Sequence, residues 1–190
     1  MPLLDHFDIL APFYDRIITV PDTSQLEDLL SLPIHGRLLD VGGGTGRISQ
    51  NLIDKTSEVI IVDLSINMLL QATDKGKLAR ICSYSESLPF EEGVFDRVIM
   101  VDALHHVINQ KNTATELWRV LKPGGKLVIE EPDVSKLIVK FIALAEKAAL
   151  MRSNLLPPEK IAALFPAGLS ENKIFRQSIN SWVVVEKNSY

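Results

Sequence analysis

The chain has few of the features that mark secreted, membrane-spanning or nucleic-acid-binding proteins. Its single cysteine, Cys82, excludes an internal disulfide and a multi-cysteine zinc site. A net charge of −4 leaves no basic surplus for contacts with a phosphate backbone. The first residues do not form a signal peptide pattern. The longest apolar stretch, residues 137–151, is interrupted by Lys140, Glu146 and Lys147 and is shorter than the ~20 residues of a membrane span. We therefore expect a cytoplasmic protein with no nucleic-acid partner and no stable membrane insertion.

Length and composition predict one globular domain. Hydrophobic residues make up 46% and charged residues 23% of the 190 residues, which is ordinary for a folded protein. A chain of this length suits a single hydrophobic core. We expect one domain over residues 1–190, which divides into an N-terminal helical cap (1–32), a cofactor-binding core (37–131), a helical lid (132–172) and a closing hairpin (173–187).

Strand and helix patterns alternate through the middle of the chain. Apolar strand patterns occur at 37–41, 59–63, 78–83, 95–101 and 126–130. Helical patterns occur at 25–32, 45–55, 65–75 and 111–121, and Ser65 is the expected cap of the third of these helices. Such alternation is typical of right-handed crossovers between parallel strands, with helices on both faces. Two later β-rich runs, 173–179 and 182–187, are separated by Asn180-Ser181. The sequence thus predicts a doubly wound α/β sheet, mostly parallel, with a C-terminal antiparallel hairpin.

A glycine-rich turn follows the first predicted strand. The segment 38–48 reads as a buried strand that ends in an acid, then a turn, then a helix, with glycine at the alternate positions Gly42, Gly44 and Gly46. Glycine permits a sharp turn and lets a ligand approach the backbone amides. A nucleotide-like cofactor is the ligand that this pattern favours.

Asp63 ends the second predicted strand, 21 residues after Gly42. That separation is expected for an acid that binds the ribose hydroxyls of an adenosine. The alternative is an acid that caps the helix beginning at Ser65.

The turn differs from a dinucleotide-binding fingerprint at two positions. That fingerprint places its third glycine where this chain has Arg47, which would crowd the helix packing. Asp40 also precedes the turn, which disfavours a pyrophosphate but suits a cofactor with an ammonium group and a cationic sulfonium. A nicotinamide-dependent oxidoreductase is therefore a less favoured hypothesis.

Taken together, the motifs resemble those of class I S-adenosylmethionine-dependent methyltransferases. The resemblance covers about residues 37–131 and implies a Rossmann-like methyltransferase sheet. It rests on Asp40-x-Gly42-x-Gly44-x-Gly46, Val62-Asp63-Leu64-Ser65, Leu88-Pro89-Phe90, Phe95-Asp96-Arg97-Val98 and Leu121-Lys122-Pro123-Gly124-Gly125. The segment 7–15 is similar to the entry segment of the ubiquinone and menaquinone methyltransferase branch.

The resemblance implies a set of cofactor-binding residues. Asp40 and the turn residues Gly42, Gly43, Gly44 and Gly46 would hold the methionyl end, and Asp63 the ribose. Tyr84 stands where the family usually has an acid for the adenine amino group. The remaining implied contacts are Leu64 and Met68 on the adenine, Ser85 through its backbone amide at the adenine edge, and Val101 beside the sulfonium. Tyr14 either lies over the cofactor or packs on a helix face.

Histidines and acids follow the fourth and fifth predicted strands. His106 is the candidate general base or orienting group for an acceptor, ahead of His105, with loop hydrogen bonding as the alternative. We predict no metal site, because adjacent histidine side chains diverge and the other histidines lie far off in sequence. The acidic residues Glu130, Glu131 and Asp133 would receive a cationic acceptor, bind a cation, or form a solvated acidic loop with one helix cap.

The function that the resemblance implies is methyl transfer from S-adenosylmethionine to a small-molecule acceptor, hydrophobic or quinone-like, with S-adenosylhomocysteine as the product. The alternative is a catalytically silent module that binds these two ligands, and both hypotheses are favoured over a nicotinamide-dependent oxidoreductase. The apolar helical pattern at 136–151 and Phe165 would serve as a lid for the acceptor, as a homodimer contact or as core.

Overall fold

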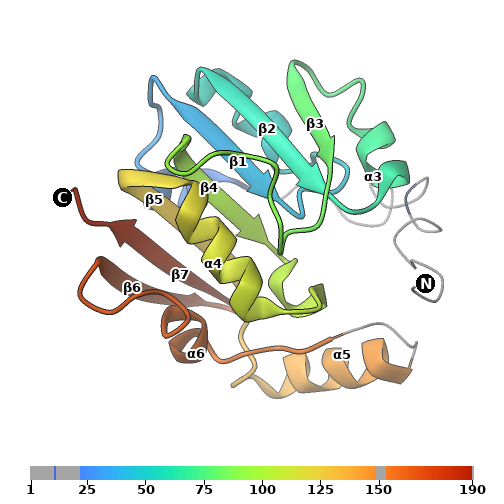
Figure 1. The fold of residues 1–190 in the computed structure, drawn as a ribbon. Coiled ribbons are helices and arrows are strands. Elements are labelled where there is room, and N and C mark those ends of the chain that lie inside the picture. Colours follow the sequence, from blue (N-terminus) through green and yellow to red (C-terminus); the bar gives the residue numbers. More distant parts are fainter. Residues whose placement is uncertain (1–10, 12–21, 149–152, 190) are drawn as a thin grey trace.

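One mixed sheet organises the computed structural model, which describes residues 11, 22–148 and 153–189. Within these residues the sheet has seven strands in the order β3-β2-β1-β4-β5-β7-β6 (Figure 1). Strands β1 to β5 pair in parallel, whereas β7 is antiparallel to both β5 and β6. The predicted α/β sheet with its antiparallel C-terminal hairpin is confirmed.

The bounds of the described elements are as follows. The strands are β1 (Arg37–Val41), β2 (Glu58–Asp63), β3 (Leu78–Cys82), β4 (Phe95–Val101), β5 (Leu121–Pro132), β6 (Ser170–Gln177) and β7 (Asn180–Lys187). The α-helices are α2 (Ser24–Leu30), α3 (Ile66–Gln71), α4 (Gln110–Val120), α5 (Leu137–Ala148) and α6 (Pro158–Ala162). Three 3₁₀ turns are η1 (Ser49–Asn51), η2 (Ile53–Lys55) and η3 (Leu104–His106).

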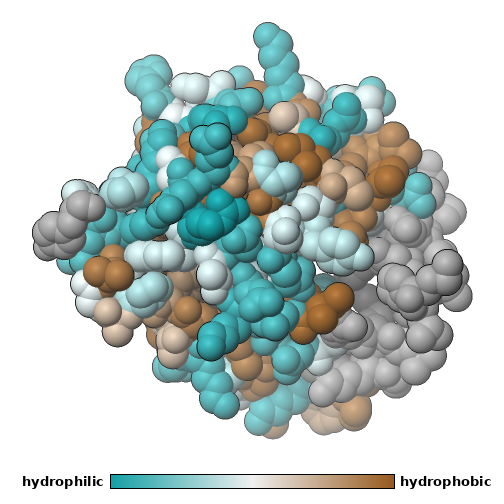
Figure 2. All heavy atoms as spheres, viewed as in Figure 1, coloured by the Kyte–Doolittle hydropathy of each residue, from teal (hydrophilic) through white to brown (hydrophobic). Residues whose placement is uncertain are grey.

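Side chains of each strand alternate between the two faces of the sheet, and the central strands β1 and β4 are buried on both faces. On β4, Val98 and Met100 belong to a cluster that α4 and α6 cover, while Ile99 and Val101 belong to a cluster with residues of α2 and α3. The outer surface, unlike these two clusters, carries mostly polar side chains on the face shown in Figure 2, with hydrophobic residues in separate groups, as the ordinary composition predicts.

The strand order reverses between β1 and β4, and this is what positions the site. After β1 the chain continues to β2 and β3 on one side, and then returns to place β4 and β5 on the other. Asp40 of β1 is paired in register with Ile99 of β4. In open α/β sheets, ligands bind beyond the carboxyl ends of the strands at such a switch point.

The helix predicted over 45–55 is wrong. The chain forms η1 and η2 there, with the N–H groups of Asn51 and Leu52 bonded to carbonyls three residues back. The segment is rich in weak helix formers, including Ser49, whose hydroxyl donates to Asp40 at 2.7 Å. Side-chain bonding of this kind competes with a regular helix.

The turn of the hairpin is also shifted from its predicted place. Gln177 pairs with Asn180, so the turn is Ser178-Ile179, and Asn180 begins β7. Ser178 takes a positive φ of 55°, as tight hairpin turns require. The Asn180 side chain donates to Glu130 at 2.7 Å, so it is used across the sheet and not in the turn.

At the chain's N-terminal side, the predicted helix from Gln25 to Leu32 is found at Ser24–Leu30. Most of the predicted helical cap, including Tyr14, lies outside the described residues. None of the described helices is long and apolar enough to cross a bilayer.

Candidate functional site

The glycine turn packs directly against the loop after β4. Gly42 has a φ of +74°, and its N–H donates to the carbonyl of Val62 at 2.7 Å. A Cβ built on Gly42 would lie 2.5 Å from Cβ of Ala103. Only glycine fits this position, because both the backbone angle and the available space exclude a side chain.

Asp63 joins the glycine turn to the start of α3. Its Oδ2 accepts the N–H of Gly44 at 2.9 Å, and its Oδ1 accepts the N–H of Ser65 at 2.8 Å. Ser65 in turn caps α3 by accepting the N–H of Met68 at 3.1 Å. The cap predicted at Ser65 is confirmed. The acid therefore lies where the ends of β1 and β2 meet, beside the turn.

Asp40 is a buried carboxylate beneath the turn. Only 1% of it is exposed, and it accepts the hydroxyl of Ser49. Burial raises the pKa of Asp40 to about 6, with the Ser49 hydrogen bond opposing that shift. A carboxyl group with this pKa gains or loses its proton readily when a charged ligand binds nearby.

Arg47 supplies the positive charge among these acids, a role that the sequence did not indicate. Its guanidinium donates to Asp102 at 3.3 Å, and the side chain is largely buried. Burial raises the pKa of Asp102 and of Glu130, and each of these groups has another carboxylate nearby that adds to the shift. Arg47 opposes the shift at Asp40 as well. The sequence shows the arginine but not its partner, which comes from a loop 55 residues later.

The residues implied for the adenine differ in their exposure. Leu64 is 44% exposed and Tyr84 is 49% exposed, whereas Met68 is only 3% exposed. The Ser85 hydroxyl lies 3.1 Å from that of Thr113 on α4. The structure thus leaves Leu64 and Tyr84 accessible and places Met68 within the protein.

The loop after β4 depends on a buried acid. Glu131, at the end of β5, is 1% exposed and accepts the N–H groups of Ala103 and Leu104 at 3.1 and 2.8 Å. Its other oxygen lies 2.6 Å from Nδ1 of His105. Glu131 and Asp133 are both buried, so the solvated-loop interpretation is wrong for them. Asp133 does accept the N–H of Ser135 just before α5.

His106 is partly buried in η3, and its ring centroid lies 3.8 Å from that of His105. The two rings are tilted by 45°. Among the described residues no group of three metal-ligating side chains comes together.

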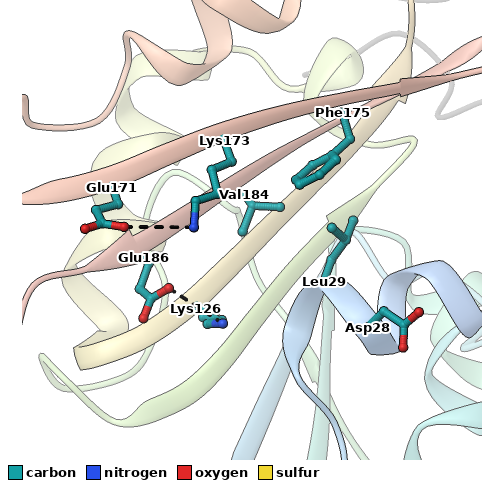
Figure 3. Close-up of a pocket in the computed structure, with 8 residues that line it drawn as sticks. All are labelled: Asp28, Leu29, Lys126, Glu171, Lys173, Phe175, Val184 and Glu186. Atoms are coloured by element: carbon teal, nitrogen blue, oxygen red, sulfur yellow. Dashed lines mark ion pairs between the residues drawn. The ribbon is translucent and has the colours of Figure 1, made fainter.

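A shallow hollow lies away from this edge of the sheet. It has a volume of about 180 Å³ and is lined by residues of α2, β5, β6 and β7 (Figure 3). Its charges pair with one another, as in Lys126 with Glu186 at 3.6 Å and Lys173 with Glu171 at 3.9 Å. Lys126 pairs with Arg97, which is near the amino end of β4, so the hollow lies away from the carboxyl ends of the strands. It is not the candidate site.

Comparison with known proteins agrees with the fold. Residues 39–129 match the family model described as "Methyltransferase domain". This segment, just under half of the chain, is similar to a methyltransferase domain. The matched segment runs from β1 to β5 and so contains the glycine turn, Asp63 and the loop after β4.

A curated relative and two solved structures are similar to this chain. The ubiquinone/menaquinone biosynthesis C-methyltransferase UbiE of Erwinia tasmaniensis is 32% identical over 150 residues, covering 65% of this chain and 59% of the relative. The chain thus spans about three fifths of that relative's length.

The two structures share the fold at low sequence identity. A chain of the complex between the Haloferax volcanii Trm112 methyltransferase activator and its methyltransferase partner has a TM-score of 0.79 at 17% identity, covering 98% of this chain and 100% of that one. An S-adenosylmethionine-dependent methyltransferase of Thermotoga maritima has a TM-score of 0.77 at 19% identity, covering 97% and 100%. At this identity the likeness establishes the fold alone.

Proposed function

We propose that this protein transfers the methyl group of S-adenosylmethionine to a small, apolar acceptor of the quinol type. The observation that carries the proposal is the meeting of Asp40, the glycine turn and Asp63 at the switch point of the sheet. A buried carboxylate suits the cofactor's ammonium group, and a carboxylate beside the turn suits ribose hydroxyls.

The proposal includes the cofactor contacts that the resemblance implies. Asp40 and the turn residues Gly42, Gly43, Gly44 and Gly46 hold the methionyl end, and Asp63 holds the ribose. The exposed Leu64 and Tyr84 cover the adenine. Met68 supports this wall from within the protein, Ser85 offers its backbone amide, and Val101 lines the sulfonium region.

Methyl transfer depends more on the alignment of the acceptor atom with the methyl carbon and the sulfur than on reactive side chains. When bound, S-adenosylmethionine supplies a methyl group on a positively charged sulfur. The acceptor atom forms its bond to the methyl carbon as the sulfur–carbon bond breaks, and the acceptor loses one proton. Correct placement of two reactants contributes up to ~7 to 11 kcal/mol toward the barrier, so no covalent intermediate on the protein is required. We assign to His106 the role of receiving or orienting that proton.

Two findings favour an apolar acceptor. One is the similarity to UbiE of Erwinia tasmaniensis, a C-methyltransferase of ubiquinone and menaquinone biosynthesis. The other is α5, whose residues Leu137, Ile138, Phe141 and Leu144 are between 54% and 72% exposed. We propose that residues 132–172 act as the acceptor's lid through this face. Phe165 does not contribute to it, because it is 4% exposed and belongs to the core.

The test begins with calorimetric titration of the protein with S-adenosylmethionine and S-adenosylhomocysteine, with NAD as the control ligand. Micromolar binding of both adenosyl ligands and none of NAD supports the cofactor assignment. The second step supplies labelled S-adenosylmethionine and a prenylated 1,4-naphthoquinol that carries hydrogen at the neighbouring ring carbon. Labelled methyl on that carbon supports the proposed reaction.

The other outcomes identify the rival functions. Binding of S-adenosylhomocysteine with no transfer to any tested quinol would favour the silent binding module or a different acceptor class. Binding of NAD alone would overturn the proposal. A sedimentation measurement at micromolar concentration tests whether a second copy covers α5 as a homodimer.

A further inference from the structure

Glu131 and His105 form a buried hydrogen-bonded pair beside the proposed cofactor site. Oε2 of Glu131 lies 2.6 Å from Nδ1 of His105, and the two side chains are 2% and 5% exposed. Oε1 of the same carboxylate accepts the N–H groups of Ala103 and Leu104. One carboxylate at the end of β5 therefore holds three successive residues of the loop after β4.

This arrangement fixes the proton on the His105 ring. The other oxygen of this carboxyl accepts two backbone N–H groups, and we infer that Oε2 likewise accepts, with Nδ1 of His105 as the donor. In a neutral imidazole the other nitrogen, Nε2, is then the acceptor. The His105 ring is thereby held at a set angle against the ring of His106, with 3.8 Å between the centroids.

The same loop forms one wall of the cofactor turn. Cβ of Ala103 lies where a side chain on Gly42 would be, which leaves the loop and the turn in direct contact. The residue before Ala103 is Asp102, which pairs with Arg47 from the other side of the turn. A shift of the loop would therefore move both the turn and His106.

We propose that Glu131 is a positioning residue for the methyl transfer. Through Nδ1 of His105 it sets the orientation of His106, and through two backbone N–H groups it sets the loop against the glycine turn. This inference rests on the proposed function and names the residue on which the geometry of that site depends.

The test uses Glu131→Gln, which keeps an oxygen for the N–H groups of Ala103 and Leu104. Its amide NH₂ faces Nδ1 of His105, which must then accept, so the proton moves to Nε2. We expect S-adenosylhomocysteine affinity within about threefold of the parent protein. We expect kcat with the prenylated naphthoquinol to fall at least about tenfold with little change in KM, because a positioned acid–base group contributes ~100- to 10,000-fold.

A spectroscopic readout accompanies the kinetics. Nitrogen spectra of the protein labelled in histidine report which ring nitrogen carries the proton, and should show Nδ1–H at His105 in the parent and Nε2–H in the variant. The His106 signals should shift with them, while those of the exposed His35 should not. The variant His105→Asn keeps a donor for Glu131 and removes the ring, so it should fold and show a similar loss of kcat.

The outcomes separate this inference from the proposed function. A parent protein that binds no S-adenosylhomocysteine refutes the proposed function and this role with it. If the parent binds and methylates but Glu131→Gln retains full kcat, the positioning role alone is wrong. If the parent binds without methylating the probe, unchanged His106 signals in Glu131→Gln overturn the inference. A His105 ring that carries its proton on Nε2 in the parent also overturns it.

Discussion

Asp63 and Gly44 are joined by a hydrogen bond across the ends of β1 and β2, in which the Gly44 N–H donates to Oδ2 of Asp63 at 2.9 Å. The residue proposed to bind ribose therefore also fixes the turn that is proposed to hold the methionyl end. Binding and the shape of the turn are consequently coupled through one carboxylate.

Asp63→Ala should weaken S-adenosylhomocysteine binding about 10- to 100-fold, because charged hydrogen bonds of this kind are worth ~1.5 to 3 kcal/mol. Calorimetric titration measures the loss. The matched control is Glu58→Ala, which removes an exposed acid at the opposite end of the same strand and should leave the affinity unchanged. Equal affinities for the Asp63 variant and the control would refute the ribose assignment.

Gly42→Ala should destabilise the fold and abolish cofactor binding. The new Cβ would lie 2.5 Å from Ala103, and the backbone has a φ of +74°. Crowding costs ~1 to 3 kcal/mol and positive φ a further ~1 to 2 kcal/mol. Gly168→Ala is the control, since its φ is +80° and nothing lies within 4 Å of the added Cβ. Urea unfolding of both variants isolates the crowding as the difference between them.

Asp40→Asn should stabilise the ligand-free protein at high pH. Because the pKa of Asp40 is raised to about 6, the native state binds its proton more tightly than the unfolded state does. Stability is then lost as pH rises between about 4 and 6, by an amount on the order of 1 to 3 kcal/mol. Asparagine removes that loss and still accepts from Ser49. The unfolding free energy should exceed the parent's at pH 8, with a gap that narrows toward pH 4; Asp54→Asn, at an exposed carboxylate, should show no such trend.

Binding of S-adenosylhomocysteine should release protons near pH 6. The ligand's ammonium group favours the ionised form of Asp40, so the pKa of that carboxyl falls when the complex forms. Calorimetry in two buffers of different ionisation enthalpy measures the protons released. Asp40→Asn should show no release in this range. Proton uptake by the parent protein would contradict the placement of the ammonium group.

Arg47→Gln should destabilise the protein more at pH 8 than at pH 5. The guanidinium favours the ionised forms of Asp40, Asp102 and Glu130, whose pKa values burial raises. At pH 5 Asp40, with its pKa of about 6, is largely protonated, and the favourable interaction between its carboxylate and the guanidinium is then mostly lost. We expect a loss on the order of 1 to 3 kcal/mol at pH 8. Arg37→Gln, which breaks an exposed pair with Glu58, should cost ~0 to 1 kcal/mol at either pH.

The positions of most strands could be predicted from local sequence pattern. Strands β1 and β4 have the predicted bounds, and Ser65 caps α3 as expected. Prediction from local pattern was wrong where side chains compete with the backbone for hydrogen bonds. Ser49 bonds to Asp40, and the predicted helix there is replaced by η1 and η2. The hairpin turn also differs from the predicted one. Asn180 is not in the turn, and its side chain donates a hydrogen bond to Glu130 of the neighbouring strand β5.

The sequence by itself determined the parallel sheet, the glycine turn and the acid at the end of β2, because each depends on the spacing of residues near one another along the chain. Only the tertiary structure decided that Arg47 pairs with Asp102 and that Glu131 holds His105. These partners are 55 and 26 residues apart. They meet because the switch point aligns the ends of β1, β4 and β5, and burial then requires each charged group to find a partner.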